Sequence, residues 1–261
     1  MIRGINSQPY INLDPYLDIA GLKQLHYKIC KGIVLTHHKK EGNIVKMGGF
    51  NDTYELPFKP TFQAIDEYFA LPEDHEIRVL GREIGEFENR DQFVLFLKLA
   101  LGAYDPYQFM FLKTEEGGWE TRFEEKSWTS DAEFFPEFKV WLEKLVTDKV
   151  FTHLGRIIIF KCEHDGLTAM HRDLIYPEET EYTNHRHEFI HLRTSLDTRP
   201  FYIWDPETGT QILTESHAIF FNDQDWHNGG KINKQTFSIR VDGIFTPEFR
   251  ERIGLSNVDF Y

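Results

Sequence analysis

Eight short runs rich in β-branched and aromatic residues follow one another after about residue 155. They are RIIIFKCE, TAMHRDL, EFIHLRTS, PFYIW, GTQILT, HAIFFN, DWHNGGKI and TFSIRVDGIF. Turn residues separate them: EHDG precedes the second run, and DPETG lies between the fourth and the fifth. Repeated short strands with such turn signals predict an antiparallel sandwich or a barrel-like jelly roll.

The first 155 residues have a different texture, in which short β-rich runs mix with helical patterns. We expect helices in KPTFQAIDEYFALP and in NRDQFVLFLKLALGA, which begins at a capping Asn89 or Asp91 and ends at Gly102. A third helix is predicted in TSDAEFFPEFKVWLEKLV, capped by Thr129 or Ser130. Its expected buried stripe consists of Phe138, Trp141, Leu142 and Leu145.

Composition is that of a folded globular protein. The 261 residues are 41% hydrophobic and 15% aromatic, enough for one large domain or a core with an accessory lobe. A net charge of -13 disfavours nucleic acid and anionic membrane surfaces as partners. No run approaches a membrane span, nothing at the N-terminus resembles a signal peptide, and two cysteines are too few for a disulfide framework. We therefore expect a cytoplasmic protein.

The string HEFIH, residues 187–191, matches the zinc-protease motif H-E-x-x-H. In that motif two histidines one helical turn apart hold zinc, and the intervening Glu188 polarises a water. The surrounding residues favour a strand, because aromatic and β-branched residues recur and TSLDTRP ends any helix soon after His191. In a strand, His187 and His191 would lie about 13 Å apart, too far to bind one ion together. A zinc metalloprotease is therefore kept only as a less favoured alternative.

A second pattern, MHRDL, fits its predicted strand better. His171 and Asp173 share one face of a strand, about 6.6 Å apart along the backbone. His227, in the seventh run, supplies a third candidate ligand. Two imidazoles and one carboxylate form the facial triad that leaves coordination positions free on non-haem Fe(II). The alternative is a hydrogen-bonded His–Asp pair, with His227 packed on Trp226.

Further support for the metal site lies in FSIRVDG of the eighth run. Arg240 lies 13 residues beyond His227, and Ser238 shares its face of the strand. The alternative for Arg240 is simple ion pairing with a carboxylate such as Asp223 or Asp242. In this order of residues the chain resembles the Fe(II)- and 2-oxoglutarate-dependent dioxygenases of the double-stranded β-helix fold. Their pattern is HxD, a distal His, and an Arg roughly a dozen residues further on that holds the distal carboxylate of 2-oxoglutarate.

The resemblance extends from RIIIFKCE to VDGIF and implies an α+β fold. Residues 156–261 would form a double-stranded β-helix core, of the jelly-roll or cupin-like kind. Residues 1–155 would form an N-terminal helical and mixed α/β framework packed on that core. In the family the HxD lies on the second core strand, the distal His on the seventh and the Arg on the eighth, and the eight runs agree with this order.

The resemblance also implies a chemistry. His171, Asp173 and His227 would hold Fe(II), and Arg240 would bind the cosubstrate 2-oxoglutarate with help from Ser238. Consumption of O2 would give a hydroxylated product, succinate and CO2. His191 and Arg193 are candidates for binding cosubstrate or substrate, with simple cross-strand pairing as the alternative. Asp173 argues against the halogenating branch of the family, which has a small residue in its place.

The substrate is predicted from the composition of two runs. Histidine, arginine, tyrosine and tryptophan crowd HRHEFIHLRT and FYIW, which favours a small polar metabolite or an amino acid, free or carrier-borne. The alternative of a different class is a metal-binding cupin that acts as an isomerase or as a small-molecule binding module. Such a cupin would explain the barrel and the metal but would leave Arg240 without a role.

Overall fold

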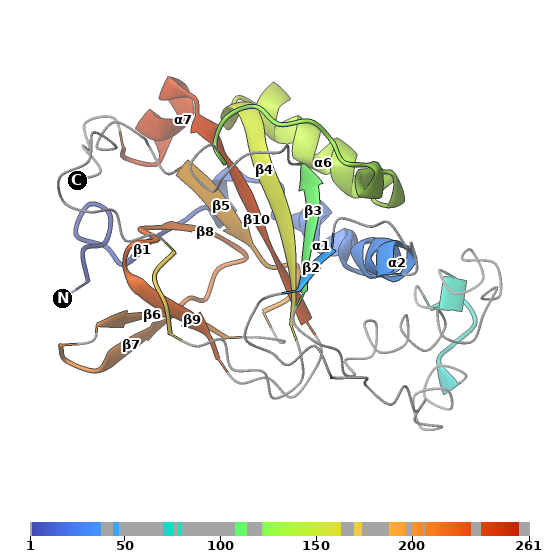
Figure 1. Cartoon of the computed structure of the whole chain (residues 1–261), viewed down its shortest axis with the longest axis horizontal. Coiled ribbons are helices and arrows are strands. Elements are labelled where there is room, and N and C mark those ends of the chain that lie inside the picture. The colour runs from blue at the N-terminus through green and yellow to red at the C-terminus, as the bar shows by residue number, and fades with distance from the viewer. Residues whose placement is uncertain are drawn as a thin grey trace.

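The strands form two antiparallel sheets, with helices beside the larger one (Figure 1). The computed structural model describes residues 2–37, 44–46, 70–75, 78–79, 108–113, 122–162, 170–173, 188–196, 200–205, 207–230 and 236–255. The helix predicted in KPTFQAIDEYFALP lies outside these residues except for its last three, and the helix predicted in NRDQFVLFLKLALGA lies wholly outside them.

The larger sheet has seven strands in the order β1-β8-β5-β10-β4-β3-β2. In chain order their bounds are β1 Tyr10–Asn12, β2 Ile44–Lys46, β3 Gln108–Lys113, β4 Phe151–Cys162, β5 Glu188–Leu192, β8 Ala218–Phe221 and β10 Thr236–Phe245. The smaller sheet has the order β7-β6-β9. Its strands are β6 Phe201–Asp205, β7 Thr210–Leu213 and β9 Trp226–Gly229.

Seven of the eight predicted runs are the strands β4 to β10, and the second run contributes an isolated bridge between His171 and His227. This bridge adds the second run to the smaller sheet beside β9. The core strands of the larger sheet are then the first, third, sixth and eighth runs, and those of the smaller sheet are the second, fourth, fifth and seventh. This distribution of strands between two sheets is a jelly roll, so the predicted α+β fold with a double-stranded β-helix core is confirmed.

Strands from both parts of the chain share the larger sheet. β4 begins at Phe151, so the predicted boundary between residues 155 and 156 lies inside this strand. β3 pairs with β4, and β1 pairs with β8 at the opposite edge. The N-terminal part therefore extends the sheet of the core at both edges.

The helices of the described residues are short. Their bounds are α1 Ile19–Gln24, α2 His26–His37, α6 Pro136–Thr147 and α7 Pro247–Arg252, with 3-10 turns η1 Asp14–Tyr16 and η3 Ser130–Phe134. The predicted cap of the third helix was wrong. Pro136 begins α6, and the Thr129 hydroxyl bonds the carbonyl of Leu112 instead of capping the helix. None of these helices is long and apolar enough to cross a membrane.

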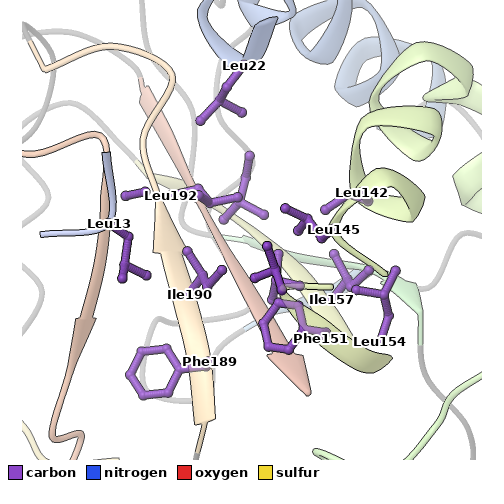
Figure 2. Close-up of a cluster of buried hydrophobic side chains, with 14 of the residues drawn as sticks. Leu13, Leu22, Leu142, Leu145, Phe151, Leu154, Ile157, Phe189, Ile190 and Leu192 are labelled. Carbon is purple, nitrogen blue, oxygen red and sulfur yellow. The ribbon is translucent and has the colours of Figure 1, made fainter. Parts of the chain in front are cut away.

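The main hydrophobic core lies between the helices and one face of the larger sheet. All four predicted stripe residues of α6 are buried, and Figure 2 shows two of them, Leu142 and Leu145, in one cluster with side chains of β4 and β5. Ile157 and Ile159 of β4 belong to this core, whereas Ile158 lies outside it and opposite Arg240 of β10. Because successive side chains of a strand alternate faces, Arg240 faces away from the hydrophobic core.

Candidate metal centre

Strand pairing brings the HxD pattern to the distal histidine. The amide of His171 donates to the carbonyl of His227 (3.1 Å), and the amide of His227 donates to the carbonyl of His171 (2.9 Å). The amide of Asp173 then donates to the carbonyl of Asp223 (3.0 Å), in the turn that precedes β9. These bonds fix the register of the second run, so that both of its candidate ligands face His227.

The three side chains form one cluster. The Nε2 atoms of His171 and His227 lie 3.4 Å and 3.3 Å from the same Asp173 oxygen, Oδ1. One ligand atom from each residue lies within 4.8 Å of the other two. Metal–ligand bonds of about 2.1 Å at right angles place neighbouring ligand atoms about 3 Å apart, so the cluster has the dimensions of a metal site. His227 is buried, whereas the His171 side chain is 43% exposed, so the cluster opens toward solvent on one side.

The tautomer of His227 suits metal binding. Its Nδ1 lies 2.8 Å from the carbonyl oxygen of Asp225, which can only accept a hydrogen bond. Nδ1 therefore carries the proton, and in the neutral ring Nε2 presents a lone pair toward Asp173. A carboxylate oxygen and an imidazole lone pair face each other favourably only with a cation or proton between them. This geometry is that of a histidine ligand whose orientation is fixed by a carbonyl group.

Asp225 was not predicted, and it links the site to the N-terminal segment. Its buried carboxylate accepts hydrogen bonds from the amides of Arg3 and Gly4, both at 2.7 Å. Gly4 has a positive φ of 64°, and a Cβ built there would lie 2.4 Å from the carbonyl oxygen of Gln8. Only glycine fits this position, and the turn it makes presents both amides to Asp225.

The second oxygen of Asp173, Oδ2, accepts from Nη1 of Arg240. Burial by itself raises the pKa of Asp173, but the charge of Arg240 and the two imidazoles hold this pKa well below its ordinary value. The carboxylate is therefore ionised at neutral pH, as a metal ligand must be.

Arg240 lies in a buried network of charges. Nε donates to Asp242 (2.6 Å) and Nη2 to Asp223 (2.9 Å), in addition to the bond to Asp173. The guanidinium also lies over the ring of Phe189, 3.7 Å from its centroid. Burial lowers the pKa of Arg240, but its three carboxylate partners outweigh this effect and the pKa is raised above its ordinary value. The ion pairs that the sequence suggested as an alternative for Arg240 are thus formed.

Two further arginines complete this network. Arg122 donates to Asp223 (2.5 Å), and Nε of Arg156 donates to Asp242 (3.0 Å). The network, here called the Arg–Asp network, consists of Arg122, Arg156, Arg240, Asp173, Asp223 and Asp242, which are all largely buried. Arg156 has a sequence signal, because it is a charged residue at the start of the apolar run RIIIFKCE. Arg122 stands in no recognisable pattern.

Ser238 and His191 lie near Arg240 on adjacent positions of the sheet. Ser238 precedes Arg240 by two residues in β10, and His191 of β5 is the direct cross-strand partner of Arg240. The His191 ring stacks on Phe201 at a centroid distance of 4.6 Å, and Phe201 in turn contacts the ring of His227 at 5.7 Å. His191 therefore belongs to an aromatic wall that adjoins the cluster.

Arg193 has a different environment. Its Nη2 donates to the carbonyls of Thr214 and Ser216, both at 2.8 Å, and to the Thr214 hydroxyl at 3.0 Å. Burial lowers the pKa of Arg193 to about 10. These bonds hold the connection between β7 and β8, and they do not bring Arg193 to the Arg–Asp network.

The HEFIH string lies on a strand in its described part, Glu188 to His191, as predicted. His187 lies outside the described residues. Glu188 pairs with Arg250 of α7 and accepts from the amide of Phe245 (2.5 Å), while His191 faces Phe201. The strand thus directs Glu188 and His191 into different environments, and the helical geometry of a zinc protease is absent from these residues.

Comparisons with known proteins found similarity of structure alone. No family model matches the chain, and no curated protein matches it. Among similar solved structures, a 2OG-Fe(II) oxygenase family oxidoreductase from Burkholderia pseudomallei has a TM-score of 0.34 and 12% identity, covering 56% of this chain and 76% of that chain. A prolyl hydroxylase from Trichoplax adhaerens, in complex with a hypoxia inducible factor peptide fragment, has a TM-score of 0.34 and 10% identity, covering 88% and 94%.

A cupin domain from Bordetella pertussis is also similar, with a TM-score of 0.23 and 12% identity over 33% of this chain and 78% of that chain. These likenesses are remote. The strand order described above does not depend on them, and by that order the chain has the double-stranded β-helix architecture of the 2OG-Fe(II) oxygenases, the prolyl hydroxylases and the cupins.

Proposed function

We propose that the protein is an Fe(II)- and 2-oxoglutarate-dependent dioxygenase. It hydroxylates a C–H bond of a small polar metabolite or an amino acid, free or carrier-borne, and forms succinate and CO2. The observation that carries the proposal is the meeting of two imidazole Nε2 atoms at one oxygen of Asp173, with the His227 tautomer fixed by the carbonyl of Asp225. Two histidines and one carboxylate are the donor set of non-haem Fe(II) oxygenases.

The charges around the cluster favour a dianionic cosubstrate. The three arginines and three aspartates of the Arg–Asp network sum to zero charge, and neutral imidazoles add none. A divalent metal on Asp173 leaves an excess of two positive charges in a largely buried space. A dianion such as 2-oxoglutarate restores neutrality, whereas a neutral ligand does not, and a buried excess charge is costly.

Each residue has a distinct part in this proposal. His171, Asp173 and His227 hold the metal, and bound Fe(II) supplies the activation of O2 and the oxidative decarboxylation of 2-oxoglutarate. Arg240 holds the far carboxylate of the cosubstrate, and Ser238 adds a hydrogen bond. His191 and Phe201 wall the space beside the metal and exclude water from it.

One observation favours the alternative of a metal-binding cupin that is an isomerase or a binding module. The three guanidinium nitrogens of Arg240 each bind an aspartate, so Arg240 has a structural role without any cosubstrate. The two functions differ in whether 2-oxoglutarate binds to the metal-loaded protein.

The test is an anaerobic titration of the Fe(II)-loaded protein with 2-oxoglutarate, followed by charge-transfer absorption in the visible range. We expect saturable binding that requires the metal and is lost in Asp173→Ala. Glutarate, which has both carboxylates but no keto oxygen, is the matched control and should give no absorption band. Metal binding without any 2-oxoglutarate binding would contradict the proposal and favour the cupin.

Arg240→Gln tests the assignment of the far carboxylate. Loss of one partner of a buried charge pair costs about 2–5 kcal/mol, so 2-oxoglutarate should bind roughly thirty-fold more weakly or worse. Arg240→Lys should restore only part of the affinity, because its point charge lacks the planar fork. Equal affinities in wild type and Arg240→Gln would remove Arg240 from the cosubstrate site.

A further inference from the structure

Asp223 is shared between two arginines. Its Oδ2 atom accepts from Nη2 of Arg122 at 2.5 Å and from Nη2 of Arg240 at 2.9 Å. Both arginines are buried, with Arg122 only 2% exposed. One carboxylate oxygen therefore bridges two guanidinium groups that come from distant parts of the chain.

The backbone is built to bring Arg122 to this position. The carbonyl of Arg122 accepts from the amide of Arg156 (2.7 Å), which places the segment against β4. A Cβ at Gly155 would lie 2.3 Å from the Arg122 carbonyl oxygen and 2.9 Å from Cα of Phe123. This close approach of two backbones needs a glycine, so the contact between Arg122 and Asp223 is a specific feature of the packing.

All three guanidinium nitrogens of Arg240 already bond an aspartate, so a dicarboxylate that binds this guanidinium bidentately competes with these partners. Asp242 bonds Nε and also pairs with Arg156, and Asp173 is needed by the metal. The remaining bond is the one from Nη2 of Arg240 to Asp223, and a ligand carboxylate can replace Asp223 there. A displaced carboxylate in a buried space is costly unless another cation receives it.

We propose that Asp223 is a displaceable counter-ion for Arg240, and that Arg122 is the positioning residue that receives it when the cosubstrate binds. This inference rests on the proposed function, since it takes Arg240 as the site of the far carboxylate. Asp223 keeps Arg240 neutralised while the site is empty of cosubstrate, and the bond to Arg122 holds Asp223 when the ligand carboxylate replaces it. Arg122 thereby sets the affinity for 2-oxoglutarate without touching it.

The experiment is a double-mutant cycle with Arg122→Gln, Asp223→Asn and the double variant. Isothermal titration under exclusion of oxygen measures two affinities for each protein: that of Mn(II), a metal that does not turn over, and that of 2-oxoglutarate for the Mn(II)-loaded form. Arg122→Gln should weaken 2-oxoglutarate binding about tenfold or more, because the displaced Asp223 then loses the cation that receives it. Its Mn(II) affinity should not fall, since loss of a positive charge does not weaken the binding of a cation.

The cycle separates displacement from a general effect of charge. If Arg122 acts only through its positive potential, Arg122→Gln should weaken 2-oxoglutarate binding by the same factor with Asp223 or with Asn at 223. If it receives the displaced carboxylate, the effect should vanish in the Asp223→Asn background. Asp223→Asn alone should bind 2-oxoglutarate as tightly as the wild type or more tightly.

Arg122→Lys is the conservative variant and guards against a folding defect. Lysine retains a charge that can receive Asp223, so its 2-oxoglutarate affinity should lie closer to wild type than that of Arg122→Gln. An Arg122→Gln effect equal in both backgrounds, or weaker 2-oxoglutarate binding by Asp223→Asn, would overturn this inference and leave the proposed function intact. Failure of the Mn(II)-loaded wild type to bind 2-oxoglutarate would overturn both.

Discussion

Glu188 and Asp173 are both carboxylates bound to an arginine, yet their remaining surroundings differ. One Glu188 oxygen pairs with Arg250 and the other accepts from the amide of Phe245, and the side chain is fully buried. Asp173 gives one oxygen to Arg240, but its other oxygen faces two imidazole nitrogens, and the side chain is 17% exposed. A carboxylate held on both oxygens by protein donors fixes the fold, whereas one with an oxygen that faces two imidazole nitrogens has the capacity to bind a metal.

The largest expected effect is a loss of metal affinity when the cluster around Asp173 is changed. Asp173→Ala or His227→Ala should weaken Mn(II) binding by more than about 100-fold, beyond the range typical of residues that only support a ligand. The melting temperature of the metal-free protein should remain well defined, because the hydrophobic core on the other face of the larger sheet does not depend on a metal. Titration calorimetry and thermal unfolding measure the two properties. Unchanged Mn(II) affinity in both variants would remove these residues from the site.

The second prediction concerns the other carboxylate of the comparison and uses the variant Glu188→Gln. This substitution removes the negative charge that pairs with the buried Arg250, so the free energy of unfolding should fall by about 3–5 kcal/mol. Mn(II) affinity should not change, because Glu188 faces α7 and not the cluster. Chemical denaturation measures the loss, and Asp148→Asn at the exposed pair with Lys144 is the matched control with no expected effect. A folded Glu188→Gln protein that fails to bind metal would reopen the protease interpretation of HEFIH.

His26 is a histidine whose contacts are all with protein groups in the described structure, and it should make the stability of the fold depend on pH. It bonds the Thr194 hydroxyl at 2.8 Å and stacks on Phe237, and burial lowers its pKa to about 4. In the unfolded chain the pKa is about 6.5, so the unfolded state binds the proton first as the pH falls. The stability is fully present above pH 6.5 and should decline by about 2–3 kcal/mol by pH 4.

His26→Gln keeps a hydrogen-bonding group beside Thr194 but cannot titrate. Denaturant titrations from pH 7 to pH 4 should therefore show a smaller decline for this variant than for the wild type. An equal decline in both proteins would assign the pH dependence to other groups. Mn(II) affinity at pH 7 should be the same in both, in contrast to the loss expected for His227→Ala.

The smallest effect concerns a residue that only supports a ligand. Asp225→Ala frees the amides of Arg3 and Gly4 and loosens the carbonyl that orients His227, so Mn(II) affinity should fall about tenfold. Gln224→Ala, which removes an exposed contact of the Arg3 side chain, is the matched control and should bind Mn(II) as the wild type does. Equal Mn(II) affinity in Asp225→Ala would separate the N-terminal segment from the metal site.

Local sequence patterns predicted the features that depend on neighbouring residues, namely the strands, their order and the face on which each side chain lies. Period two placed His171 and Asp173 on one face, and the alternation of turns and strands gave the order of the eight runs. Among the described residues, the second run nevertheless forms a single β-bridge instead of a strand. Strand propensity could not predict this difference, because it is the same for a bridge and for a full strand. The cap of α6 was missed because the hydroxyl of Thr129 bonds Leu112 on a neighbouring strand, a tertiary contact that overrides a local preference.

The supporting residues of the site could not be predicted, because their partners lie far away in the sequence. Arg122 is 101 residues from Asp223, and Arg3 is 222 residues from Asp225. Neither pair has a spacing rule, since a buried carboxylate accepts hydrogen bonds from any guanidinium or backbone amide that the fold brings near. For Arg193 the sequence left ligand binding and cross-strand pairing open. Its guanidinium bonds the backbone carbonyls of Thr214 and Ser216, whose positions follow from the connection between β7 and β8.

The bonds from Arg3 and Gly4 to Asp225 also bear on how the protein folds. Contacts between residues so far apart in the chain close large loops, and such contacts form late because the entropy of loop closure must be overcome first. β1 follows this segment and pairs with β8, so the same docking event also completes an edge of the larger sheet. During refolding, full affinity for a metal should therefore appear only after this docking, and later than the secondary structure of α6, whose backbone hydrogen bonds are local.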